Sequence, residues 1–212
     1  SNSGNIISGN ILSLDFNISQ TGNGIASHIV IFRDSLPWDS YAMDSVMISL
    51  GLTFGPGNMQ YLIYSSAEID TATLNSESDL VIISNDQPQE FYDNYARNQL
   101  KFDNFLDNGG SIFWEACDMG WNYGSITSSN ITLPGRVQIN YSLDIFNLKS
   151  SYQYGLLSGL PDSLNGNYAS VESFANLPSG AIIYMVNSQG HPTLAGFECG
   201  QGWAIISGQP LE

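Results

Sequence analysis

The sequence predicts an α/β fold built around a parallel β-sheet. Short runs that are apolar throughout alternate with segments of helical periodicity, which is typical of a parallel sheet buried on both faces. Toward the C-terminus the apolar runs are joined by short links that contain glycine, which indicates antiparallel hairpins. The chain has 212 residues, enough for one domain of ordinary size.

The parallel part of the sheet is predicted within the first 117 residues. Its strands are expected at 28–34, 60–64, 80–83 and 111–117. From Met43 to Leu50, apolar side chains recur at i, i+3, i+4 and i+7, which predicts a helix after the first strand. A second helix begins at Pro88 and ends at Gly109 and Gly110, because proline suits the first helical turn and glycine the position after the last.

The rest of the chain carries different patterns. Residues 118–180 contain turn signals and scattered apolar residues, and no helix is predicted there. Three closing strands are expected at 181–187, 193–198 and 203–208. Near the N-terminus, residues 11–19 alternate between apolar and polar side chains, which predicts an extra strand with one face in solvent. We therefore divide the chain into an N-terminal extension, 1–26, and an α/β domain, 27–212.

The charge and the hydropathy of the chain argue against nucleic acid and membrane as partners. Five Lys and Arg residues against twenty Asp and Glu residues give a formal net charge of −15. Nucleic acid is not an expected partner, because phosphate binding needs clustered cations. Membrane insertion is not expected either, because no apolar run is long enough to span a bilayer.

The low proportion of charged residues favours a secreted or cell-surface location. Only 12% of the residues are charged, so solubility depends on the many Asn, Ser and Gly residues. Three N-glycosylation sequons, at Asn17, Asn130 and Asn140, agree with export. Two cysteines are too few for a disulfide framework and do not decide the compartment.

Several short motifs carry a resemblance to a known superfamily. The strand 80–83, a helix and Asn108-Gly109-Gly110-Ser111 follow in that order, and the chain closes on a strand that runs into Gln209-Pro210. This arrangement resembles the class I glutamine amidotransferase-like superfamily over about residues 28–212. The resemblance implies a flavodoxin-like parallel sheet with antiparallel closing strands, to which this chain adds an N-terminal strand.

The catalytic motifs of that superfamily are altered in this sequence. Catalytic members carry their cysteine in a Gly-x-Cys-x-Gly turn and their base in His-Pro-Glu, whereas this chain has Glu115-Ala116-Cys117-Asp118-Met119 and Gln209. A closer resemblance, through Asp118-Met119-Gly120-Trp121, Pro192-Thr193-Leu194 and Ser207-Gly208-Gln209, is to non-catalytic relatives in large secreted and surface proteins of bacteria and archaea. It implies a module without an established activity.

An enzymatic alternative depends on Cys117. A cysteine on a turn after a buried strand is how α/β enzymes present a nucleophile. The base would be His191, because the strand that follows it runs antiparallel to the last strand and so begins at the same edge of the sheet as Cys117. In that hypothesis the protein is a Cys117-dependent hydrolase or amidotransferase.

A third hypothesis is a binding module at the same edge of the sheet. Asp34, Asp86 and Asp118 each follow a strand and could offer oxygen ligands to Ca²⁺, although such residues more often cap helices and turns. Aromatic residues are candidates for a sugar-binding surface, although core packing is their commoner role: Trp38, Tyr41, Trp114, Trp121 and Tyr123.

From the sequence we expect a non-catalytic, secreted or cell-surface domain that serves structure or assembly. Its expected partners are further copies of itself or other surface proteins, and no cofactor is expected unless Ca²⁺ binds. The strand at 11–19 could add to the sheet of a neighbouring molecule and link subunits into a chain.

Overall fold

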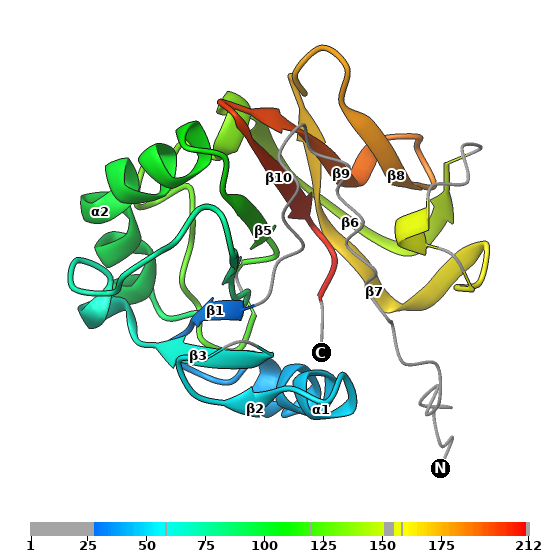
Figure 1. Ribbon diagram of the computed structural model, residues 1–212. Helices are drawn as coiled ribbons and strands as arrows, with labels where there is room; N and C mark the ends of the chain where they lie inside the picture. Colours follow the sequence, from blue (N-terminus) through cyan, green and yellow to red (C-terminus); the bar gives the residue numbers. More distant parts are fainter. Residues whose placement is uncertain (1–27, 58, 119, 151–154, 158, 211–212) are drawn as a thin grey trace.

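A mixed β-sheet of ten strands runs through the described part of the chain, which in this computed structural model comprises residues 28–57, 59–118, 120–150, 155–157 and 159–210 (Figure 1). The order of the strands is β2-β3-β1-β4-β5-β10-β9-β8-β6-β7. The predicted strand at 11–19, with Asn17, lies outside the described residues.

The strands are β1 (His28–Phe32), β2 (Thr53–Phe54), β3 (Gln60–Tyr64), β4 (Asp79–Ile83), β5 (Ser111–Glu115), β6 (Gln138–Lys149), β7 (Ser163–Ala175), β8 (Ile182–Asn187), β9 (Pro192–Cys199) and β10 (Gly202–Ser207). The α-helices are α1 (Ala42–Ser49) and α2 (Gln89–Asp107). Short 3-10 helices lie at Pro37–Asp39, Ser66–Glu68, Pro134–Arg136 and Gly155–Leu157.

The predicted α/β architecture is confirmed. Strands β2, β3, β1, β4, β5 and β10 are parallel neighbours, and β10, β9 and β8 are joined as antiparallel hairpins. Phe32 on β1 pairs with Ile83 on β4, which in turn pairs with Trp114 on β5. This register brings the ends of the three strands to the same level, and so fixes where the loops that follow them meet.

The two α-helices cover opposite faces of the parallel half. On one face, Met47 of α1 packs with Ile31 and Ile82. On the other face, α2 buries Phe91, Tyr95, Phe102 and Leu106. Alternate residues of a strand point to opposite faces, so the fully apolar strands contribute to both clusters.

Strands β6 and β7 are the main difference from the predicted fold. They lie within the segment 118–180, where no helix was predicted and no strand was assigned, and they form a long antiparallel ribbon at the far end of the sheet (Figure 1). The ribbon curls back toward the parallel half. The backbone N–H groups of Val171 and Glu172 on β7 both donate to the carbonyl oxygen of Gly208, after β10, at 2.9 and 3.2 Å. This contact brings Glu172 to the ends of the parallel strands.

Candidate functional site

The loops after β1, β4 and β5 meet at one edge of the sheet. We call this region the strand-end edge and define it as residues 33–44, 84–88, 116–118 and 120–126. Asp34, Asp86, Cys117 and Asp118 all belong to it, as the parallel register predicts. The N–H of Asp86 donates to the carbonyl oxygen of Cys117 at 3.1 Å, so two of these loops touch directly.

Cys117 is fully buried, and its thiol lies beside a buried carboxyl group. The thiol forms a hydrogen bond with the carboxyl group of Glu172 from β7. Burial raises the pKa of the Cys117 thiol well above its ordinary value, and the neighbouring Glu172 raises it further. A thiol in these surroundings stays protonated at neutral pH and is a poor nucleophile, because the thiolate is the reactive form.

Glu172 and Asp118 form a pair of buried carboxyl groups linked by a hydrogen bond. Burial, followed by the charge of Asp118, raises the pKa of Glu172 to about 9, and burial also raises the pKa of Asp118. Asp118 Oδ2 accepts a hydrogen bond of 2.6 Å from the N–H of Ile126. Glu172 is therefore protonated at neutral pH, because two neighbouring carboxyl groups that are buried away from water cannot both be ionised.

Glu115, the last residue of β5, is a third buried acid, and it lies at the same end of the sheet. Burial raises its pKa to about 8, and the N–H of Asn85 donates to its Oε2 at 3.2 Å. The end of β5 thus carries several acidic groups that the fold holds away from water.

A network of neutral polar groups surrounds Gln209, the position at which the sequence resemblance implies a histidine in catalytic relatives. Gln209 is buried, and its Nε2 lies 3.2 Å from Met185 Sδ and 3.5 Å from Thr193 Oγ1. Thr193 Oγ1 and Ser170 Oγ both donate to Asn147 Oδ1, at 3.0 and 3.2 Å. These amide and hydroxyl groups do not take up a proton near neutral pH, so they cannot act as a general base.

His191 lies in the turn between β8 and β9, at the edge expected from the topology. Its side chain is exposed, and its backbone N–H donates to Asn187 Oδ1 at 2.9 Å. Cys117 is buried against Glu172. A catalytic Cys117–His191 pair stays a prediction, which would require the thiol to become accessible.

Asp34 and Asp86 hold the loops of the strand-end edge together. Asp34 accepts hydrogen bonds of 2.6 Å from both the N–H and the hydroxyl group of Ser66. Asp86 Oδ2 accepts from the N–H of Trp38, and Asp86 Oδ1 accepts from the N–H of Asn122, each at 2.8 Å. Among the described residues, no group of three or more His, Cys, Asp or Glu side chains is arranged to hold a metal ion.

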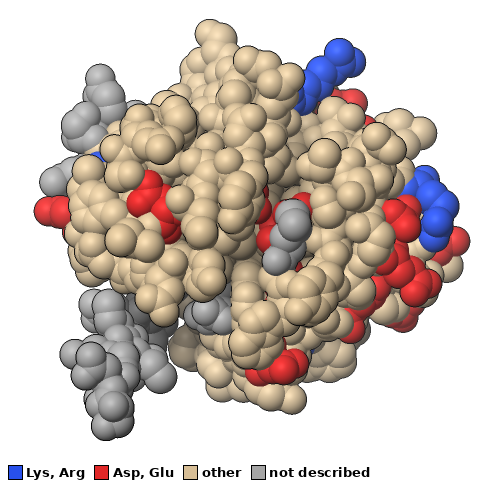
Figure 2. Space-filling model, turned by 180° about the vertical axis from the view of Figure 1, so that it is seen from behind, with Lys and Arg blue, Asp and Glu red and all other residues tan. Residues whose placement is uncertain are grey.

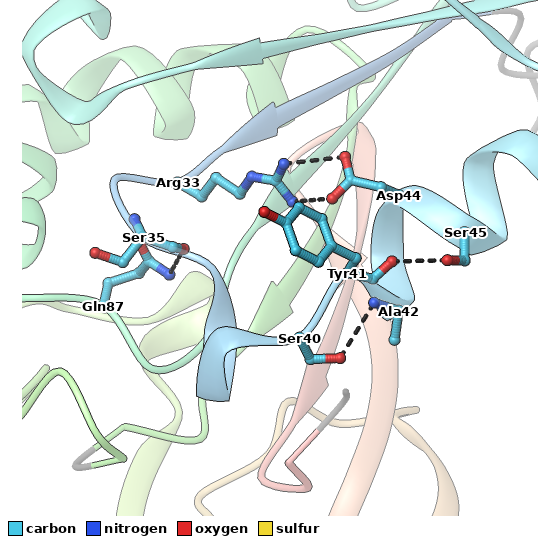
Figure 3. A network of polar contacts seen from close by, with 8 residues as sticks. All are labelled: Arg33, Ser35, Ser40, Tyr41, Ala42, Asp44, Ser45 and Gln87. Atoms are coloured by element: carbon cyan, nitrogen blue, oxygen red, sulfur yellow. Dashed lines mark hydrogen bonds and ion pairs between the residues drawn. The ribbon is translucent and has the colours of Figure 1, made fainter.

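Gln87 also links the loops of the strand-end edge through hydrogen bonds. Its Oε1 accepts from the N–H groups of Asp34 and Ser35, at 2.6 and 2.9 Å, and its Nε2 donates to the carbonyl oxygens of Ser35 and Asn85. Figure 3 shows Gln87 reaching Ser35, and Arg33 facing Asp44 of α1. Arg33 makes a two-pronged ion pair with Asp44, at 2.8 and 3.0 Å, so its charge is already matched.

The aromatic residues singled out from the sequence divide into two groups. Trp114 is fully buried in the core, where its Nε1 donates to the hydroxyl group of Tyr95 at 3.0 Å. Tyr41, Trp121 and Tyr123 are exposed, against the expectation that core packing is their role. Packing does not explain these three residues.

Sequence reasoning missed Glu172 as a member of the site. It reaches Cys117 only because β7 curls back against Gly208, and no local motif marks this single acid among Ser, Ala and Val residues. Of the sequon residues, Asn130 and Asn140 are exposed. Their glycosylation is untested.

Comparison with known proteins supports the fold. No family model matches the chain. An uncharacterized protein from Clostridium acetobutylicum is 28% identical over 192 residues, which cover 90% of this chain but only 19% of that protein. The chain thus spans about a fifth of the length of this curated relative.

Two solved structures, both of cytoplasmic proteins from Salmonella typhimurium, share the fold. One has a TM-score of 0.56 at 11% identity and covers 87% of this chain and 89% of its own; the other has a TM-score of 0.54 at 13% identity and covers 85% and 86%. At 11% and 13% identity, these likenesses show that the chain shares its α/β fold with the two proteins.

The predicted secreted or cell-surface location is contradicted by these comparisons, because both matching structures belong to cytoplasmic proteins. The sequence argument depended on a low content of charged residues and on sequons, and a chain rich in Asn and Ser produces sequons by chance. Within the described residues, no helix is both long enough and apolar enough to cross a bilayer.

Proposed function

We propose that this domain is non-catalytic and serves structure or assembly, with Cys117 as a packing residue. The observation that carries the proposal is the placement of Cys117: the thiol is fully buried, and its hydrogen bond goes to a carboxyl group that is itself buried. A catalytic cysteine needs a lowered pKa and access for its substrate, and these surroundings oppose both.

The polar groups around Gln209 support the same proposal. A glutamine amide held against Met185 and Thr193 supplies no proton acceptor at the position where the superfamily resemblance implies a histidine. The buried pair Glu172 and Asp118 has a structural use, because it ties the β6–β7 ribbon to the loop after β5.

An activity assay tests the proposal against the enzymatic alternative. Wild-type protein and the Cys117→Ala variant are incubated with glutamine and, separately, with p-nitrophenyl acetate, and the release of glutamate or p-nitrophenol is followed. We expect neither protein to exceed the rate without protein. A hydrolysis rate that is present in wild type and lost in a folded Cys117→Ala variant contradicts the proposal and favours the Cys117-dependent hydrolase.

For the assembly role, we propose that a second copy of this chain binds to the exposed face of strand β6. Tyr141, Leu143 and Ile145 alternate along β6 and are all exposed. These three side chains carry no charge, so a contact made through them adds no direct repulsion between two molecules of net charge −15. Sedimentation velocity over a range of concentrations tests this: wild type should associate and an Ile145→Lys variant should not. A wild type that stays monomeric at every concentration refutes it.

A further inference from the structure

Three large aromatic side chains stand in solvent at the strand-end edge. Tyr41 is 67% exposed, Trp121 is 62% exposed and Tyr123 is 85% exposed. Burial of aromatic side chains contributes strongly to the stability of a domain, and these three residues are left exposed instead. Exposed apolar groups of this kind often mark an interaction site. Tryptophan and tyrosine are also the residues that most often dominate binding at protein interfaces.

The two loops that carry these residues are fixed to each other. One buried carboxylate, that of Asp86, accepts the N–H of Trp38 from the first loop and the N–H of Asn122 from the second. Gly120 lies so close that an added Cβ would come within 2.4 Å of the Asp86 carboxyl group. Trp121 and Tyr123 flank Asn122, and Tyr41 follows Trp38 by three residues. The aromatic groups are therefore presented on a prearranged surface, which lowers the entropy lost on binding.

Charge at this edge is strongly negative. The strand-end edge and the adjoining residues 89–94 together contain seven Asp and Glu residues and a single basic residue, Arg33, whose charge is matched by Asp44. Asp39 and Glu90 are exposed. Figure 2, a view of the molecule from behind, shows Asp and Glu groups at several places and Lys and Arg groups only near the margin, in keeping with the net charge of −15 of the whole chain. An anionic ligand would be repelled here, and a cationic one attracted.

We propose that the strand-end edge docks a cationic peptide segment of a partner protein. Arginine side chains of that segment stack on Trp121 and Tyr123, because the guanidinium group is planar and is attracted to aromatic faces. Asp39 and Glu90 add attraction at the rim and speed the encounter. This inference does not depend on the absence of catalysis, because Trp121, Tyr123, Asp39 and Glu90, which would meet the peptide, are exposed, whereas Cys117 is buried.

Binding of a short fluorescein-labelled peptide in which arginine alternates with glycine tests the proposal by fluorescence anisotropy. A second peptide carries citrulline in place of arginine, which keeps the shape and removes the charge. We expect the arginine peptide to bind wild type, to bind more weakly as salt is added, and to bind at least about tenfold more tightly than the citrulline peptide.

Two sets of variants locate the site. The double variant Trp121→Ala with Tyr123→Ala should weaken binding by about tenfold or more. Its matched control is Phe54→Ala with Tyr168→Ala, which removes residues that are 63% and 61% exposed on β2 and β7 and should leave binding unchanged. The variant Asp39→Asn with Glu90→Gln keeps the aromatic groups and should reduce both the affinity and its dependence on salt.

Four results would overturn the proposal. Three of them are the absence of binding to wild type, equal binding of the citrulline peptide, and an equal loss of binding in the control pair on β2 and β7. The fourth is that wild type binds a neutral oligosaccharide, maltohexaose, and that the double variant Trp121→Ala with Tyr123→Ala loses this binding but still binds the peptide. That last result would assign the aromatic surface to a carbohydrate.

Discussion

The buried acid Glu172 makes the stability of the domain depend on pH. Its pKa in the folded protein is raised to about 9 from an ordinary value of 4.5. Between these values the folded state holds a proton that the unfolded chain has released, so the free energy of unfolding falls as the pH rises from about 4.5 to about 9. Each pH unit is worth about 1.4 kcal/mol, which makes the cost about 3 kcal/mol at pH 7.

Replacing Glu172 by Gln should remove this dependence. The amide is neutral at every pH, and it can still accept from the Cys117 thiol and donate to Asp118. We expect Glu172→Gln to match wild type near pH 5 and to exceed its free energy of unfolding by about 4 kcal/mol at pH 8. Glu115, whose pKa is raised to about 8, remains in the variant and leaves part of the slope in place.

Urea unfolding followed by tryptophan fluorescence at several pH values between 5 and 8 measures both slopes. Glu198→Gln, a change of the same kind at an exposed position on β9, is the matched control and should follow wild type. If Glu172→Gln loses stability with pH as steeply as wild type does, the buried, protonated state of Glu172 is refuted.

Two further substitutions test the contacts that build the strand-end edge. Gly208→Ala should cost about 1–3 kcal/mol of unfolding free energy, because the added Cβ would lie 2.2 Å from the carbonyl oxygen of Glu172; Gly166→Ala, where the nearest atom is 4.0 Å away, is the control. Gln87→Ala should cost about 1–3 kcal/mol, because it leaves the partly buried N–H groups of Asp34 and Ser35 without their acceptor. The exposed Gln201→Ala should cost little, and equal losses in either pair would contradict the assigned contacts.

The parallel half of the fold was predictable because its signals are local. Strands such as β4 are apolar throughout, and the periodicity of α2 matches the face that it buries. In β6, Tyr141, Leu143 and Ile145 alternate with polar residues, and this period of two indicates a strand, although no strand was assigned within 118–180. β7 carries a weaker signal, because Gly166 and several Asn residues interrupt it.

The site was predictable only in part, for a physical reason. Parallel topology alone places Asp34, Asp86 and Cys117 at one edge. Whether Cys117 is reactive depends on Glu172, which arrives through a long-range contact of the curled ribbon. The exposure of Trp121 and Tyr123 is likewise a property of the folded loops, since their sequence does not distinguish a core aromatic residue from a surface one.

The rate at which iodoacetamide labels Cys117 as a function of urea tests the central claim most directly. The Cys199→Ser variant leaves Cys117 as the single thiol. In the absence of urea we expect labelling to be slower than in the unfolded chain by at least about 10³-fold, because the thiol is exposed only when the domain opens. The rate should rise with urea in parallel with unfolding. Fast labelling in native buffer at neutral pH, independent of urea, would show an accessible thiolate and contradict the account.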